Sequence, residues 1–157
     1  MKKLLCGLIC CICVVSAGCS NEFAYEEYDS DEKIIQSGDR YAKSMSNTKT
    51  SVDTLTFSAG KFDGRETLWY GDISDDCLLE FSFSLSIESG QAKLVHIDEQ
   101  DNITTIVECG SDNILEDSVT RTIRFNEGDN CFKIVGCGCE DVELEIEFID
   151  YSDNKKR

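Results

Sequence analysis

The chain has 157 residues, which is room for one domain with extensions, because domains commonly run to about 100 to 200 residues. It carries 15 Lys and Arg against 31 Asp and Glu, a net charge of -16. This acidity disfavours binding to nucleic acid and disfavours adhesion of the protein surface to anionic lipid headgroups. Any attachment to a membrane must therefore come from a different feature.

The N-terminus has the three parts of an export signal. Lys2 and Lys3 form a positive region, an apolar run extends from Leu4 to Val15, and small residues follow it. A run of about 12 residues is too short to cross ~30 Å of hydrocarbon as a helix, so a permanent transmembrane anchor is not expected. Loss of the signal would leave 13 basic against 31 acidic residues.

The small residues at the end of this run are Ser16-Ala17-Gly18-Cys19. The segment resembles the lipobox of bacterial lipoproteins, although Ser16 stands where that family usually has a branched apolar residue. The resemblance implies a signal peptide at residues 1–18, cleavage between Gly18 and Cys19, and acyl chains such as palmitate anchoring Cys19 to the outer side of the cell membrane. Two or more acyl chains give stable anchoring. The alternative is a plain cleaved signal with Cys19 as a free thiol.

Residues 19–50 are predicted to form a flexible or weakly helical linker. Residues 21–32 are acidic and have no regular apolar period, which is typical of a solvated tether. The tether has three aromatic residues that pack locally or dock a partner: Phe23, Tyr25 and Tyr28. Residues 31–46 have apolar spacing compatible with a short helix, but Gly38 interrupts it.

Residues 51–151 are predicted to form one all-β domain, followed by a tail at 152–157. Apolar and polar residues alternate most clearly from Leu79 to Ile87 and from Val142 to Phe148, which predicts strands with one inward face. About eight strands at regular spacing, with turn residues between them, indicate an antiparallel β-sandwich. The predicted strands are 54–58, 66–70, 79–88, 92–97, 103–107, 119–125, 131–135 and 142–148.

Three stretches carry a resemblance to a group of proteins: residues 89–97, Thr104-Thr105 and residues 127–136. They resemble small lipoproteins of Gram-positive bacteria that have a jelly-roll-like domain of unassigned function. The resemblance rests on strand and turn patterns, and it implies a fold without implying an activity.

Five cysteines remain outside the signal and the lipidation site: Cys77, Cys109, Cys131, Cys137 and Cys139. An odd number cannot all pair within one chain. Cys109 ends one predicted strand and Cys131 begins another, so they could form a disulfide if their Cα atoms lie within about 7 Å. Cys137 and Cys139 lack the further ligands that a tetrahedral metal site needs.

Enzymatic chemistry finds little support in the sequence. The only histidine, His96, lies in an apolar strand and is predicted to be a structural, half-buried imidazole. No phosphate-binding loop, HExxH motif or catalytic serine motif is present. We therefore expect no enzyme.

Two acidic loops have the oxygen ligands that Ca²⁺ prefers. Neither has the spacing of an EF-hand, and Asp and Asn also form ordinary turns. No metal site and no cofactor are therefore predicted. The two loops are Asp72, Asp75 and Asp76, and Asp98, Asp101 and Asn102.

Three functions remain. The leading one is an extracytoplasmic, lipid-anchored module that binds an envelope protein or another partner without catalysis. The second is a carbohydrate-binding module that uses Trp69 or Tyr70; adjacent residues on a strand point to opposite faces, so at most one of them faces a ligand. The third is a small envelope hydrolase, which would need two carboxylates facing each other within about 10 Å.

Overall fold

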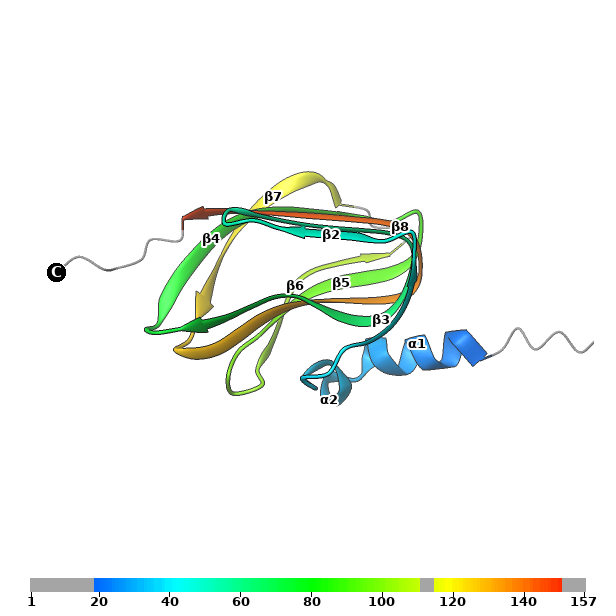
Figure 1. Cartoon of the computed structure of the whole chain (residues 1–157), viewed down its shortest axis with the longest axis horizontal. Coiled ribbons are helices and arrows are strands. Elements are labelled where there is room, and N and C mark those ends of the chain that lie inside the picture. Colours follow the sequence, from blue (N-terminus) through cyan, green and yellow to red (C-terminus); the bar gives the residue numbers. More distant parts are fainter. Residues whose placement is uncertain (1–18, 111–114, 151–157) are drawn as a thin grey trace, which may run out of the picture.

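The computed structural model describes residues 19–110 and 115–150. The predicted signal peptide, with Gly18, and the predicted tail at 152–157 lie outside these residues. The described chain forms two helices and eight strands (Figure 1): α1 (Cys19–Asp29), α2 (Asp31–Ile34), β1 (Arg40–Ser44), β2 (Asn47–Thr50), β3 (Thr54–Ile73), β4 (Cys77–Ser86), β5 (Ser89–Ile97), β6 (Ile103–Gly110), β7 (Leu115–Phe125) and β8 (Gly128–Asp150).

The strands form an antiparallel sandwich in which β3 and β8 belong to both layers. These two strands pair along most of their length, from Thr54 opposite Glu147 to Ile73 opposite Gly128. The start of β3 and the end of β8 lie in a first sheet with the order β2-β3-β8-β4-β7. The other halves lie in a second sheet with the order β1-β3-β8-β5-β6. The predicted antiparallel sandwich is confirmed, and its strand order is that of a jelly roll.

Seven of the eight predicted strands lie within observed strands, and the eighth, predicted at 79–88, coincides with β4 up to Ser86. The segments 54–58 and 66–70 are the two halves of β3, and 131–135 and 142–148 are the two halves of β8. The edge strands β1 and β2 were not predicted, because their exposed residues carry no apolar alternation.

Both long strands bend where they pass from one sheet to the other. On β3 the register shifts between Phe62 and Gly64, which is typical of a β-bulge. Gly64 has φ 102°, and a Cβ at this position would overlap the backbone of Arg40. On β8, Asp141 also has a positive φ of 46°. The two sheets can therefore face each other because a glycine occupies the corner of β3.

The core lies between the two sheets, and aromatic rings fill its centre. Phe132 on β8 has ring centroids of Trp69, Phe81 and Phe125 within 5.5–5.8 Å. The inward faces predicted for β4 and for the end of β8 are confirmed, since alternate residues are buried there: Leu79, Phe81, Phe83, Leu85 and Ile87 on or beside β4, and Val142, Leu144 and Ile146 on β8.

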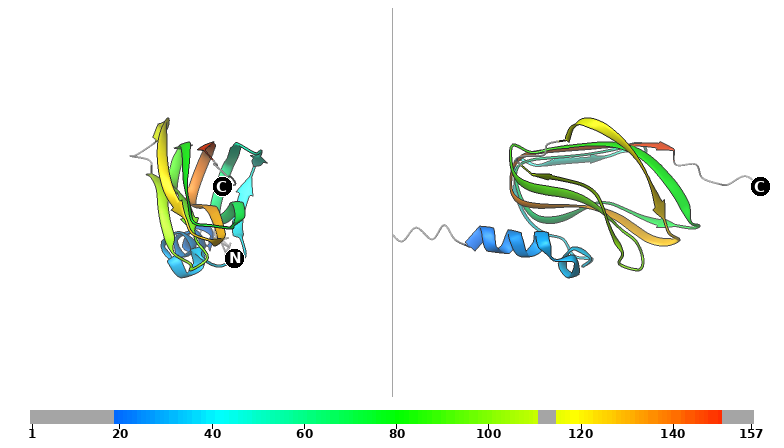
Figure 2. Two further views of the ribbon diagram at one scale, coloured as in Figure 1. Left: turned by 90° about the vertical axis from the view of Figure 1, so that its left-hand side faces the viewer. Right: turned by 180° about the vertical axis from the view of Figure 1, so that it is seen from behind.

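The N-terminal segment differs from the expected solvated tether. Residues 19–39, which we call the strap, contain both helices and lie on the outer face of the second sheet (Figures 1 and 2). Ala24, Tyr28 and Ile34 are at most 3% exposed. They pack against sheet residues Val95, Ile97, Val135 and Cys137. The strap is therefore part of the folded domain, because this apolar outer face needs a cover.

Candidate binding pocket

A pocket of about 250 Å³ lies where the strap meets the second sheet. Its walls come from the segment directly after α2, from β3, from β8 and from the β5–β6 loop. Most of its lining is polar or acidic, with one aromatic ring. The lining residues include Ile35, Ser37, Thr67, Tyr70, Asp98, Glu99, Asp101, Asp129, Asn130, Cys131 and Lys133.

Tyr70 supplies the aromatic ring of this pocket. It lies on β3 and its side chain is 61% exposed, whereas Trp69 beside it packs against Phe125 and Phe132 in the core. The prediction that these neighbours point to opposite faces is confirmed. A hydrogen bond to Asp129 raises the pKa of Tyr70 to about 12, so the phenol keeps its proton at neutral pH.

Asp98 begins the β5–β6 loop that forms the acidic side of the pocket. Its carboxylate accepts hydrogen bonds from the backbone N–H groups of Gln100 and Asn102 and from the side-chain amides of Asn102 and Asn126. Burial acts to raise the pKa of Asp98, but the hydrogen bonds from Asn102 and Asn126 outweigh it and lower the pKa. Asp98 therefore holds the loop in shape as an anion.

In each of the two acidic loops, an aspartate carboxylate accepts hydrogen bonds from nearby donors. Asp98 is saturated by N–H donors, and Asp101 donates its backbone N–H to the Asp98 carbonyl at 3.0 Å. In the other loop, Asp76 accepts from Arg124 at 2.6 Å and from the Glu127 backbone at 2.9 Å, while Asp72 and Asp75 are exposed. Among residues 19–110 and 115–150, no group of three or more His, Cys, Asp or Glu could hold a metal ion.

Lys133 lies at the base of the pocket and is only 2% exposed. Its ammonium donates to the carbonyl of Ile34 at 3.1 Å and to the carbonyl of Gln36. Burial lowers the pKa of Lys133, because removal from water disfavours the charged ammonium. A cation on β8 thus holds the end of α2, where backbone carbonyls lack helical partners.

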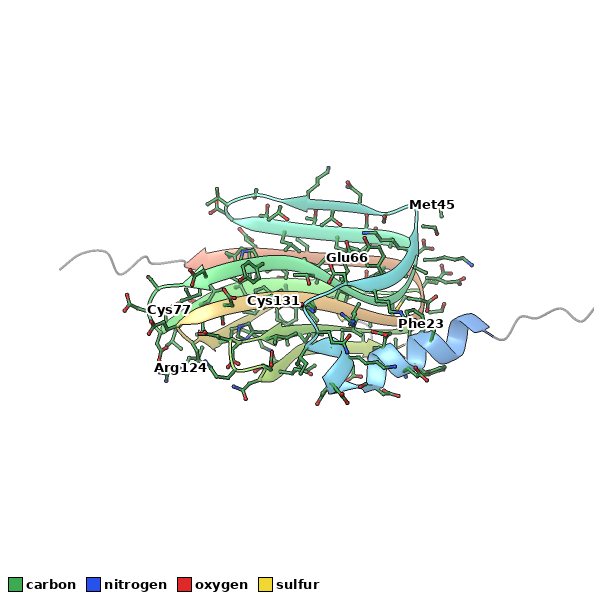
Figure 3. All side chains as sticks on the ribbon, turned by 60° about the horizontal axis from the view of Figure 1, so that its bottom comes forward. Phe23, Met45, Glu66, Cys77, Arg124 and Cys131 are labelled. Atoms are coloured by element: carbon green, nitrogen blue, oxygen red, sulfur yellow. The ribbon has the colours of Figure 1, made fainter. Side chains whose placement is uncertain are left out.

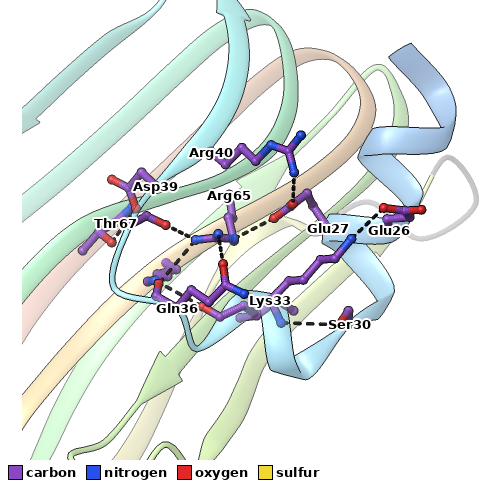
Figure 4. A network of polar contacts seen from close by, with 12 residues as sticks. Glu26, Glu27, Ser30, Lys33, Gln36, Asp39, Arg40, Arg65 and Thr67 are labelled. Carbon is purple, nitrogen blue, oxygen red and sulfur yellow. Dashed lines mark hydrogen bonds and ion pairs between the residues drawn. The ribbon is translucent and has the colours of Figure 1, made fainter. Parts of the chain in front are cut away.

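Arg65 on β3 holds the same part of the strap (Figure 4). Its guanidinium donates to Glu27, to the carbonyls of Gln36 and Gly38, and to the side chain of Gln36. Nearby, Asp39 accepts from the backbone N–H and the hydroxyl of Thr67 at 2.9 and 2.8 Å. The roles of Arg65 and Lys133 were not predicted from the sequence, since charged residues on strands usually face solvent.

The structure does not bring Cys109 and Cys131 together. Both lie on strands next to β5, but their partners there are Ala92 and Ile97, five residues apart and so about 16 Å along the strand. Cys109 faces the core between the sheets, whereas Cys131 lies on the side covered by the strap. A disulfide between them does not fit this fold.

The other cysteines are also separated. Cys137 faces the strap and Cys139 faces the core, because Gly138 between them has φ 62°. Cys137 and Cys139 therefore do not form a chelating pair. The remaining cysteine, Cys77, lies with Arg124 at the end of the sandwich opposite to Phe23 on α1 (Figure 3).

His96 has the structural role that was predicted, although it is more deeply buried than expected. It is 3% exposed, its Nε2 lies 2.9 Å from Oδ1 of Asn130, and its ring centroid is 4.5 Å from that of Phe125. Burial lowers the pKa of His96. Asn130 in turn donates to the carbonyls of Asn126 and Gly128, so this pair shapes the β7–β8 turn.

A larger groove of about 460 Å³ lies on the outer face of the first sheet. Its side chains are hydroxyls and carboxylates of adjacent strands, such as Thr56, Ser84 and Glu145. The one aromatic residue among its lining residues, Phe57, is buried. The Tyr70 pocket is smaller, but it combines an exposed ring with walls from several elements. That combination is the usual character of a ligand site.

Cys19, the predicted lipidation site, is the first residue of α1. Within the part of the chain that the structure describes, neither helix has the length and apolar character needed to cross a bilayer.

No protein-family model matches the sequence, and no curated protein matches it. Among solved structures, the chain is similar to a carbohydrate-binding module from Cellvibrio mixtus lichenase 5A in complex with cellotriose, with 11% identity and a TM-score of 0.35 over 69% of this chain and 91% of that one. It is similar to murine APRIL, with 14% identity and a TM-score of 0.36 over 69% and 95%. It is also similar to the CBM35 from Paenibacillus barcinonensis, with 13% identity and a TM-score of 0.30 over 70% and 92%. The strand order by itself establishes the sandwich.

Proposed function

We propose that this chain is a lipid-anchored, non-catalytic binding module on the outer side of the cell membrane, and that the Tyr70 pocket binds carbohydrate. One observation carries the choice of ligand. An exposed tyrosine ring lies among carboxylates in a pocket with walls on several sides. A ring stacks on the apolar face of a sugar, and carboxylates accept hydrogen bonds from its hydroxyls.

The size of the pocket limits what it can hold. Its volume of about 250 Å³ lies below the ~300 Å³ at which sites for drug-sized ligands usually begin. We therefore expect it to hold one or two sugar units, such as the end of a longer glycan. The acidic lining favours a neutral or positively charged sugar over a sulfated or phosphorylated one.

A printed array of neutral oligosaccharides tests the choice of ligand. We expect binding by the natural chain and a loss of about tenfold with Tyr70→Ala, because losing an aromatic ring that stacks on a sugar costs about 1.4 kcal/mol. Tyr41→Ala is the matched control, since Tyr41 is 44% exposed on β1 and lies outside the pocket. An array on which no glycan binds the natural chain would overturn the carbohydrate proposal.

Replacement of Cys19 by serine tests the anchor. The resemblance to the lipobox supports lipidation, so we expect the Cys19→Ser chain to lose acylation and to leave the membrane fraction in detergent-free buffer. Incorporation of labelled palmitate measures the acylation directly. A serine variant that still sediments with membranes would contradict the proposed lipid anchor.

A further inference from the structure

The strap forms one wall of the Tyr70 pocket. Ile35 and Ser37, directly after α2, line the pocket together with Tyr70. Thr67, another lining residue, is held by two hydrogen bonds to Asp39 at the end of the strap. If the strap left the sheet, the pocket would lose this wall and Lys133 would lose both of its acceptors.

The strap is also the segment that joins the sandwich to Cys19. Its first helix begins at Cys19 and ends ten residues later at Asp29. Tyr28 near the end of that helix donates its hydroxyl to Glu108 on β6 at 2.7 Å, and Glu27 accepts from Arg65 at 2.7 Å. The same docked segment therefore connects the proposed lipid site to the pocket.

We propose that ligand binding in the Tyr70 pocket and docking of the strap on the second sheet are coupled. This inference rests on the proposed function of the pocket. A ligand that contacts the strap wall binds the docked form more tightly, so its binding stabilises docking, and loss of docking weakens binding by the same factor. A bound ligand would then hold the strap, and with it the link between Cys19 and the sandwich, in the docked position.

The test needs a measure of docking that is independent of ligand. Cys137 provides one, because its thiol is 5% exposed and lies under the strap, outside the pocket lining. Modification of Cys137 by N-ethylmaleimide, followed by mass spectrometry of its peptide, reports how often the strap opens. Burial raises the pKa of this thiol, so the rates are compared at one fixed pH.

Two variants loosen the strap from positions that do not line the pocket. Glu27→Gln removes the carboxylate that pairs with Arg65, and Tyr28→Phe removes only one hydrogen bond and serves as the milder variant that folds most readily. Glu26→Gln is the matched control, because Glu26 pairs with Lys33 within the strap on its exposed side. Circular dichroism confirms that the sandwich is folded in each.

We expect Cys137 modification to accelerate by about tenfold or more in Glu27→Gln, because the rate follows the undocked fraction of the strap. A saturating array oligosaccharide should slow this modification in the natural chain and in Glu27→Gln, by up to the ratio of its affinities for the docked and undocked forms. Tyr28→Phe should accelerate modification less than Glu27→Gln does, and Glu26→Gln should leave the rate unchanged. Modification that a saturating oligosaccharide does not slow would overturn the coupling and leave the proposed function intact. Absence of binding by the natural chain would overturn the proposed function, and the coupling with it.

Discussion

Glu27 on α1 and Arg65 on β3 form a buried ion pair across the interface between the strap and the second sheet. Oε2 of Glu27 lies 2.7 Å from Nε of Arg65, and the two side chains are 2% and 3% exposed. Oε1 of Glu27 also accepts from Arg40 at 3.2 Å. Each side chain offsets the cost of burying the opposite charge, so removal of either one leaves an unpaired buried charge.

Arg65→Met tests this pair. It leaves the Glu27 carboxylate buried with only Arg40 beside it, and we expect the free energy of unfolding to fall by about 3–5 kcal/mol. Urea denaturation measures this change. Lys61→Met on the same strand is the control, because Lys61 and its partner Glu140 are 69% and 48% exposed, and its effect should stay within about 1 kcal/mol. Equal effects of the two substitutions would contradict the role of burial.

Phe81→Ala tests the centre of the core. Phe81 is fully buried and contacts the rings of Phe83, Phe132 and Phe148, so its truncation should lower the free energy of unfolding by about 3–5 kcal/mol. Leu78→Ala on the same strand is the control, since Leu78 is 67% exposed, and a change within about 0.5 kcal/mol is expected. Thermal or urea unfolding of both variants measures the two changes. A large loss of stability in Leu78→Ala would contradict the exposure of Leu78.

Gly64→Ala tests the corner of β3. Gly64 has φ 102°, and an added Cβ would overlap the backbone of Arg40 on β1. We expect a loss of at least about 1 kcal/mol, with β1 displaced from β3. Gly110→Ala is the control, because a Cβ there has no atom within 4 Å. Hydrogen exchange of β1 amides should increase in Gly64→Ala alone; unchanged exchange would argue against the clash.

The raised pKa of Cys139 predicts that the folded protein loses stability at alkaline pH. Burial raises the pKa of its thiol from 9.0 to about 12, so above pH 9 the unfolded chain loses a proton that the folded chain retains. Stability from this group is complete below pH 9 and declines as pH rises toward 12, by up to about 1.4 kcal/mol per pH unit.

Urea denaturation between about pH 8.5 and 10 measures this slope, because tyrosine side chains begin to ionise above about pH 10. Cys139→Ala should be less stable at pH 8 but should show a shallower decline. The other buried thiols contribute to the decline in both proteins, because their pKa values are raised as well. Parallel slopes in the natural chain and in Cys139→Ala would contradict the raised pKa of Cys139.

The strap shows why part of the fold was missed in the sequence. One face of α1 is buried, but that face contains Glu27 beside Ala24 and Tyr28, so it has no apolar period. The charge of Glu27 is matched by Arg65, which lies 38 residues away in the chain. A pattern within one segment cannot reveal a partner at that distance, and the segment therefore resembled a solvated tether.

The sequence by itself determined the all-β class, the eight strand segments and the opposite orientations of Trp69 and Tyr70. These follow from alternation with a period of two, which is a local property of the chain. Only the tertiary structure decided that β3 and β8 each pass through both sheets, that the strap docks through Arg65 and Lys133, and that Tyr70 lies in a pocket. Those features depend on contacts between residues far apart in the chain, and their energies depend on burial, which the fold alone sets.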